Sequence, residues 1–65
     1  MTDIITFKIF KFAWRLNFAG RMMEKTKCSF REGMRRANDA ILIRPDWYKF
    51  DGAQIADERM EIYRQ

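Results

Sequence analysis

The stretch that decides the fold is residues 4–18, which read Ile-Ile-Thr-Phe-Lys-Ile-Phe-Lys-Phe-Ala-Trp-Arg-Leu-Asn-Phe. It holds five of the chain's eight phenylalanine and tryptophan residues. Its basic residues recur at i, i+3 and i+7, which places Lys8, Lys11 and Arg15 on one narrow stripe of a helix. We therefore predict a helix over residues 3–25, capped by Thr2 or Asp3. A strand over residues 6–12 is the alternative, because Phe and Ile favour strands, but it would separate the two lysines.

Three lines of side chains surround this basic stripe on the predicted helix. An apolar stripe on one side consists of Ile5, Ile9, Phe12, Leu16, Ala19 and Met23, and the other flank consists of Phe7, Trp14 and Phe18. A line of mostly small residues lies opposite and lets another helix approach closely: Thr6, Ala13, Asn17 and Gly20. Gly20 is also a point where the helix could end or bend. The segment is more apolar than so short a chain can cover, and we expect the uncovered surplus on the Phe7, Trp14 and Phe18 flank.

Length and composition restrict the fold and the compartment. The 65 residues make one domain, residues 1–65, whose core is marginal without help. Cys28 is the only cysteine and there is no histidine, which excludes a disulfide framework and a structural zinc site and favours a reducing compartment. The basic residues within the apolar run exclude a membrane span and a signal peptide. Interleaved basic and bulky apolar residues also suit a helix lying on a membrane surface, but a central core helix is the better interpretation.

Charge is distributed unevenly along the chain. The net charge is +4, yet residues 1–44 carry ten Lys and Arg against four Asp and Glu, whereas residues 45–65 carry three against five. The positive surplus therefore belongs to the first two thirds of the chain.

Two capping patterns predict two more helices. Ser29 followed by Glu32 matches the capping box and predicts a helix from Ser29 to about Ala40 or Ile41, whose apolar face is Phe30, Met34, Ala37 and Ile41. Pro45 forbids continuation, which leaves residues 41–50 as a loop or a hairpin. Asp51 and Gln54, with a Phe50–Ile55 staple, predict a last helix from Gly52 to about Arg64. The predicted fold is all-α, a three-helix domain with a turn or short β-hairpin between the second and third helices, around residues 43–50.

The residues for enzyme chemistry are missing or scattered. Without histidine the chain lacks the commonest general base near neutral pH, and its three glycines form no phosphate loop. Asp57, Glu58 and Glu61 are best interpreted as a solvated helix face, and Cys28 as a structural residue. We therefore expect a non-enzymatic protein with no catalytic residue, no metal and no cofactor.

Nucleic-acid binding is the competing hypothesis. Arg31, Arg35, Arg36 and Asn38 lie on the predicted helix 29–40, and arginine and asparagine read base edges well. This helix and the one before it would form a helix-turn-helix regulator. Glu32 and Asp39 neutralise part of the face, so a solvated basic face is the plainer interpretation.

Two segments carry a resemblance to a known class of proteins. Ala13-Trp14-Arg15-Leu16, followed by Ser29-Phe30-Arg31-Glu32-Gly33-Met34-Arg35-Arg36-Ala37, is similar to small helical accessory proteins encoded by bacteriophages, over about half the chain. The resemblance implies a protein that acts in the host cytoplasm by binding host machinery, commonly to block host defence.

These observations together predict a small binding protein that inhibits or modifies a host protein or nucleoprotein complex. Direct nucleic-acid contact and assembly into a homo-oligomer stay open. The residues expected to contact the partner are the basic and aromatic ones: Lys8, Lys11, Trp14, Arg15, Phe18, Arg31, Arg35, Arg36, Trp47 and Tyr48.

Overall fold

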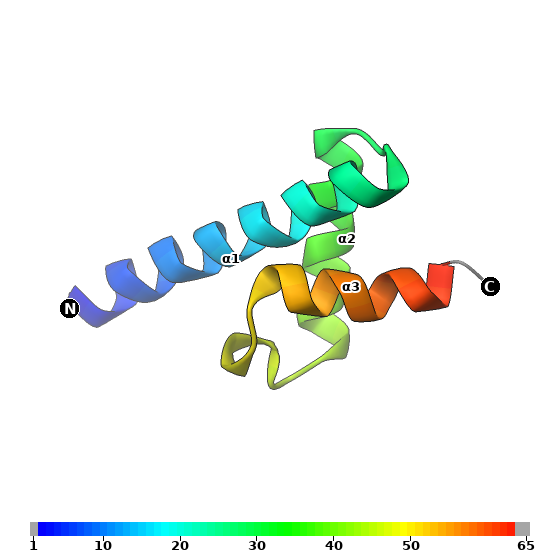
Figure 1. Cartoon of the computed structure of the whole chain (residues 1–65). Helices are drawn as coiled ribbons and strands as arrows, with labels where there is room; N and C mark the ends of the chain where they lie inside the picture. Colours follow the sequence, from blue (N-terminus) through cyan, green and yellow to red (C-terminus); the bar gives the residue numbers. More distant parts are fainter. Residues whose placement is uncertain (1, 64–65) are drawn as a thin grey trace.

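The computed structural model describes the backbone of residues 2–63 and the side chains of residues 5–61. It consists of helices α1 (Thr2–Thr26), α2 (Phe30–Ile43) and α3 (Gly52–Tyr63), with a short 3₁₀ helix, η1 (Trp47–Lys49), between α2 and α3 (Figure 1). No strand occurs in the described part of the chain, so the all-α prediction is confirmed and the strand over residues 6–12 is wrong. The turn or short hairpin predicted between the second and third helices is not confirmed, because η1 lies there. The side chains of Thr2 and Asp3, one of which is predicted to cap the first helix, and the predicted helix end at Arg64 lie outside the described residues.

Helix α1 is the central element of the fold. It is 25 residues long, about 37 Å at the usual rise per residue, and runs straight through Gly20. Helices α2 and α3 both pack on α1, and they touch each other much less. Because they pack on its C-terminal half, its N-terminal half projects beyond the body of the molecule (Figure 1). The molecule, with this projection included, measures 42 × 21 × 15 Å.

The core forms where the other elements meet this C-terminal half. Its buried members are Trp14, Phe18, Met22, Ala37, Ala40, Trp47, Ile55, Ala56 and Met60. Trp14 and Phe18 are only 3% and 0% exposed, so the prediction that their flank is uncovered is wrong for these two residues, whereas Phe7 of the same flank is 50% exposed. The chain between η1 and α3 lies against Trp14, whose indole Nε1 donates to the Phe50 carbonyl at 2.9 Å.

Two glycines allow the close helix contacts of this core. A Cβ on Gly33 would come within 3.1 Å of the Ala19 Cα, so glycine lets α2 pack directly on α1. A Cβ on Gly52 would collide with the Trp14 carbonyl oxygen and come within 2.9 Å of the Phe18 nitrogen. Both α2 and α3 therefore meet α1 almost backbone to backbone.

These contacts differ from the faces expected from the sequence. The buried residues of α2 are Gly33, Ala37 and Ala40, whereas Phe30 is exposed and Met34 and Ile41 are half-buried. Of the predicted small-residue line, Asn17 lies near the start of α3, with 3.2 Å between its Cβ and the position of a Cβ on Gly52, whereas Ala13 and Gly20 are exposed.

Helix α2 starts as predicted and ends later. The Ser29 hydroxyl accepts a hydrogen bond from the Glu32 N–H at 3.1 Å, which confirms the N-cap. The helix continues to Ile43, two or three residues beyond the expected end, and Arg44 then adopts extended geometry, as a residue before proline must.

The carboxylate of Glu32 is held by two arginines of the same helix. It pairs with Arg35, and it accepts from the Arg36 Nε at 3.2 Å. The hydrogen bond from Arg35, more than any other contact, lowers the pKa of Glu32 below its ordinary value of 4.5.

We predict opposite effects on stability when two glycines are changed to alanine. Gly52→Ala lowers the free energy of unfolding by about 2 kcal/mol, because the new Cβ collides with fixed backbone atoms of α1. Gly20→Ala raises it by about 1 kcal/mol, because Gly20 lies inside a helix with no atom within 4 Å of the added methyl group. Urea unfolding followed by circular dichroism measures both, and equal effects at the two positions would contradict the contact between α3 and α1.

We predict that Glu32→Gln lowers stability at neutral pH and not in acid. A carboxyl group whose pKa is lower in the folded chain stabilises the fold above its unfolded pKa. That contribution disappears as the pH falls through the pKa of the folded form. The difference in free energy of unfolding between wild type and variant should therefore shrink between pH 7 and pH 3. The control is Glu24→Gln, whose nearest ion-pair contact, with the Lys25 Nζ, is long at 3.9 Å.

Candidate protein-binding surface

The projecting half of α1 exposes most of its large apolar side chains. Six residues between positions 5 and 16 are at least 40% exposed: Ile5, Phe7, Ile9, Phe10, Phe12 and Leu16. Soluble monomers rarely expose a contiguous apolar patch of more than a few hundred Å² unless it binds something. We therefore take this half of α1 as the candidate functional site.

One face of the projecting half has no cover from the rest of the described chain. Its apolar side chains are Ile5, Ile9, Phe12 and Leu16, which we call the outer stripe. Ile5 and Ile9 are the most exposed, at 62% and 64%. These four residues belong to the six-residue apolar stripe predicted from the sequence. The exposed part ends before Ala19, because α2 packs on α1 there.

The opposite flank of the projecting half leans on η1. Phe7 and Phe10 lie 6.1 and 6.0 Å from Trp47, measured between ring centroids, and Trp14 lies 5.1 Å from it. Trp47 is itself buried, and Tyr48 beside it is exposed. Of the predicted aromatic anchors, only Tyr48 therefore offers substantial surface. Trp14, Phe18 and Trp47 are core residues, and their burial corrects the prediction that they contact a partner.

A positive edge separates the outer stripe from the aromatic flank. It is formed by Lys8, Lys11 and Arg15, and no described carboxylate pairs with either lysine. Arg15 donates from Nη1 to the Asn38 side-chain oxygen at 3.0 Å and lies over the Phe12 ring. Residues 4–23 contain no acidic residue, so the part of α1 that carries the outer stripe is positive.

Two of the three α2 arginines predicted to contact the partner pair with carboxylates of the same helix. Arg36 turns inward to Glu32 and approaches the Thr26 hydroxyl at 3.4 Å. Arg35 points outward but pairs with Glu32 and, at 3.1 Å, with Asp39. The face therefore carries acidic and basic groups bound to each other, which weakens the helix-turn-helix alternative.

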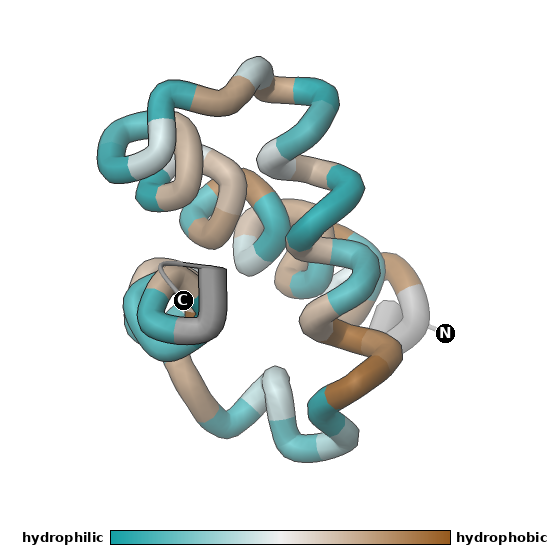
Figure 2. Tube along the Cα trace, turned by 90° about the vertical axis from the view of Figure 1, so that its right-hand side faces the viewer, coloured by the Kyte–Doolittle hydropathy of each residue, from teal (hydrophilic) through white to brown (hydrophobic). Residues whose placement is uncertain are grey.

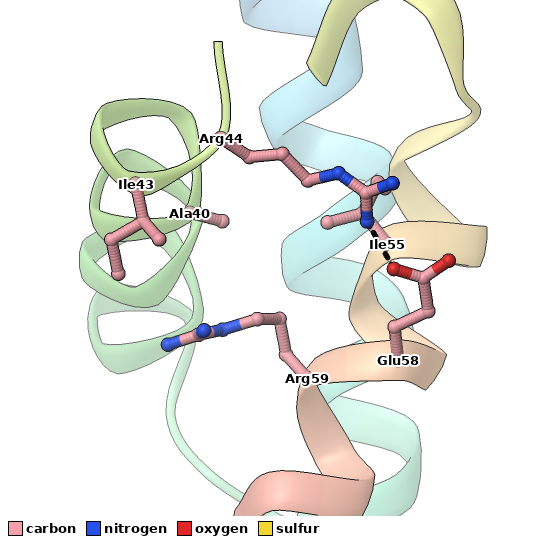
Figure 3. A pocket seen from close by; sticks show the side chains of 6 residues that line it. All are labelled: Ala40, Ile43, Arg44, Ile55, Glu58 and Arg59. Carbon is pink, nitrogen blue, oxygen red and sulfur yellow. Dashed lines mark hydrogen bonds and ion pairs between the residues drawn. The ribbon is translucent and has the colours of Figure 1, made fainter. Parts of the chain in front are cut away.

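A pocket of about 170 Å³ lies between α2 and α3 (Figure 3). Arg44 reaches across it from the end of α2 to the Glu58 carboxylate, and its Nε donates to Asp46 at 3.1 Å. Arg59 reaches back from α3 toward α2 (Figure 3). The pocket is smaller than the ~300 Å³ at which small-molecule sites begin. The pairing of Arg44 with Glu58 is better understood as a link that holds α3 to the end of α2.

A second apolar patch lies at the end of α2. The deepest hydrophobic colour of the chain trace marks this end, just before the chain turns toward η1 (Figure 2). Leu42 and Ile43 are 82% and 61% exposed there. These two neighbours form a much shorter patch than the outer stripe.

Other kinds of site have little support among the described residues. No group of three or more His, Cys, Asp or Glu side chains in that part of the chain could hold a metal ion. None of the helices, within the same residues, is long and apolar enough to cross a membrane. Cys28 is a half-buried free thiol that packs against the core.

The projecting half of α1 must be interpreted from its own geometry. Comparisons with protein-family models, with curated proteins and with solved structures find no match to this chain. The resemblance to bacteriophage accessory proteins therefore stays a prediction.

Proposed function

We propose that this protein is a small non-enzymatic binding protein that attaches to another protein through the projecting half of α1. One observation carries the proposal: six large apolar side chains are exposed together on one rigid helix, beside a positive edge. A folded core holds this helix by its other half, so its shape is set before a partner arrives. Preorganisation of this kind reduces the entropy lost on binding.

The class of partner follows from the resemblance to bacteriophage accessory proteins. We propose that the partner is a host protein or nucleoprotein complex and that attachment inhibits or modifies it in the host cytoplasm. Lys8, Lys11 and Arg15 are the contact residues of the predicted set that lie beside the exposed apolar surface, and Tyr48 borders its aromatic flank. Arg31 and Arg35 would contribute only where the partner also reaches α2.

We predict that binding depends on the outer stripe. Ile5→Glu/Ile9→Glu places two charges on the stripe, and both positions are more than 60% exposed, so the fold should survive. Leu42→Glu/Ile43→Glu is the matched control, since it adds the same charges at exposed positions on α2. Wild type and control, immobilised and exposed to bacterial lysate, should retain the same proteins, whereas the stripe variant should lose them.

Two outcomes would contradict this function. One is equal capture by all three chains, and the other is no capture by the wild type above bare resin. Circular dichroism establishes that each variant is folded. A titration with labelled duplex DNA at two salt concentrations completes the test, because salt-sensitive binding there would favour the DNA-binding regulator instead.

A further inference from the structure

We propose that the outer stripe receives a single amphipathic helix of the partner and that the edge of this helix beside Lys8 and Arg15 is acidic. The inference rests on the proposed function and specifies the chemistry of the partner. It commits to a helix of another protein, in preference to a second copy of this chain or a membrane surface.

The spacing of the outer stripe fits a helix. Ile5, Ile9, Phe12 and Leu16 follow one another at intervals of four, three and four residues, the alternation of a helix–helix seam. The stripe is about 16 Å long at the usual rise per residue, or three helical turns. A partner helix of similar length can place its own apolar side chains between these four.

The surface beside the stripe leaves room for such a helix. Thr6 and Ala13, on the edge of the stripe away from the lysines, are both exposed. Small side chains let helix backbones approach closely, but they add little apolar area. Binding to a bilayer surface strengthens with the apolar area that is buried. The small side chains beside the stripe therefore favour a docked helix over a membrane surface.

The charge beside the stripe selects an acidic partner. Lys8, Lys11 and Arg15 line one edge, and no described carboxylate pairs with either lysine. The other edge carries the uncharged side chains of Thr6, Ala13 and Asn17. A carboxylate-bearing edge on the partner would give Lys8 and Lys11 the ion pairs that they lack among the described residues.

Two copies of this chain paired along the outer stripe do not supply that complement. If two α1 helices paired antiparallel along the stripe, their basic edges would face each other and repel. If they paired in parallel, each basic edge would face the uncharged edge of the other. Asp57 and Glu58 of α3 already pair with Arg21, at 3.8 Å, and with Arg44.

Two synthetic peptides of matched design test the inference. Each has three heptads with leucine at the two seam positions, and the flanking positions are glutamate in one peptide and lysine in the other. Fluorescence anisotropy should show that the wild-type chain binds the glutamate peptide at least about tenfold more tightly than the lysine peptide. Ile5→Glu/Ile9→Glu should lose this binding, and Leu42→Glu/Ile43→Glu should keep it.

A charge-reversal variant tests the role of the basic edge more directly. Lys8→Glu/Lys11→Glu changes two side chains outside the core and should reverse the preference, so that the lysine peptide binds better. The chain alone should sediment as a monomer at the concentrations used. It should also stay in solution with vesicles of phosphatidylcholine and phosphatidylserine at physiological salt.

Each remaining outcome overturns the inference. Equal binding of both peptides, no binding of either, or a preference that survives charge reversal would remove the acidic helix as the occupant. A dimer dispersed by the stripe variant would assign the stripe to a second copy, and co-sedimentation with vesicles would assign it to lipid. If lysate capture depends on the stripe but the peptides do not discriminate, the proposed function stands and only this inference fails.

Discussion

The rest of the structure depends on the crossing of α1 by the chain between Phe50 and Gly52. There the Trp14 indole donates to the Phe50 carbonyl at 2.9 Å, and Gly52 lies against the α1 backbone with no room for a side chain. This contact fixes the direction in which α3 leaves, and it holds η1 beneath the aromatic flank of α1. Because Trp14 lies midway along α1, the contact also determines how much of the helix the body of the protein can cover.

The projecting half of α1 is the consequence of that position. The second close contact, between Gly33 and Ala19, lies even nearer the end of α1. Helices α2 and α3 therefore both pack on one half, and η1 alone reaches back to Phe7 and Phe10. No described element packs over the outer stripe, so its side chains stay exposed.

Charge follows the same division of the molecule. In the described body, acidic side chains pair with nearby basic ones: Glu32 and Asp39 with Arg35, Glu58 with Arg44, and Asp57 with Arg21. Between Ile4 and Leu16 the projecting half carries only basic charge. No described carboxylate pairs with Lys8 or Lys11, and this positive edge beside the outer stripe supports a partner helix with an acidic edge.

The sequence by itself determined the three helices, the Ser29 cap and the excess of apolar surface in residues 4–18, because periodicity and capping are local properties. Its helical periodicity also placed the four residues of the outer stripe on one face of the first helix. Only the tertiary structure decided which apolar flank is buried. Periodicity divides a helix into faces without saying which face another element will cover, so Trp14, Phe18 and Trp47 were expected at the surface and lie in the core. The roles of Gly33 and Gly52 likewise depend on close backbone contacts between segments far apart in sequence. A local sequence pattern does not predict such contacts.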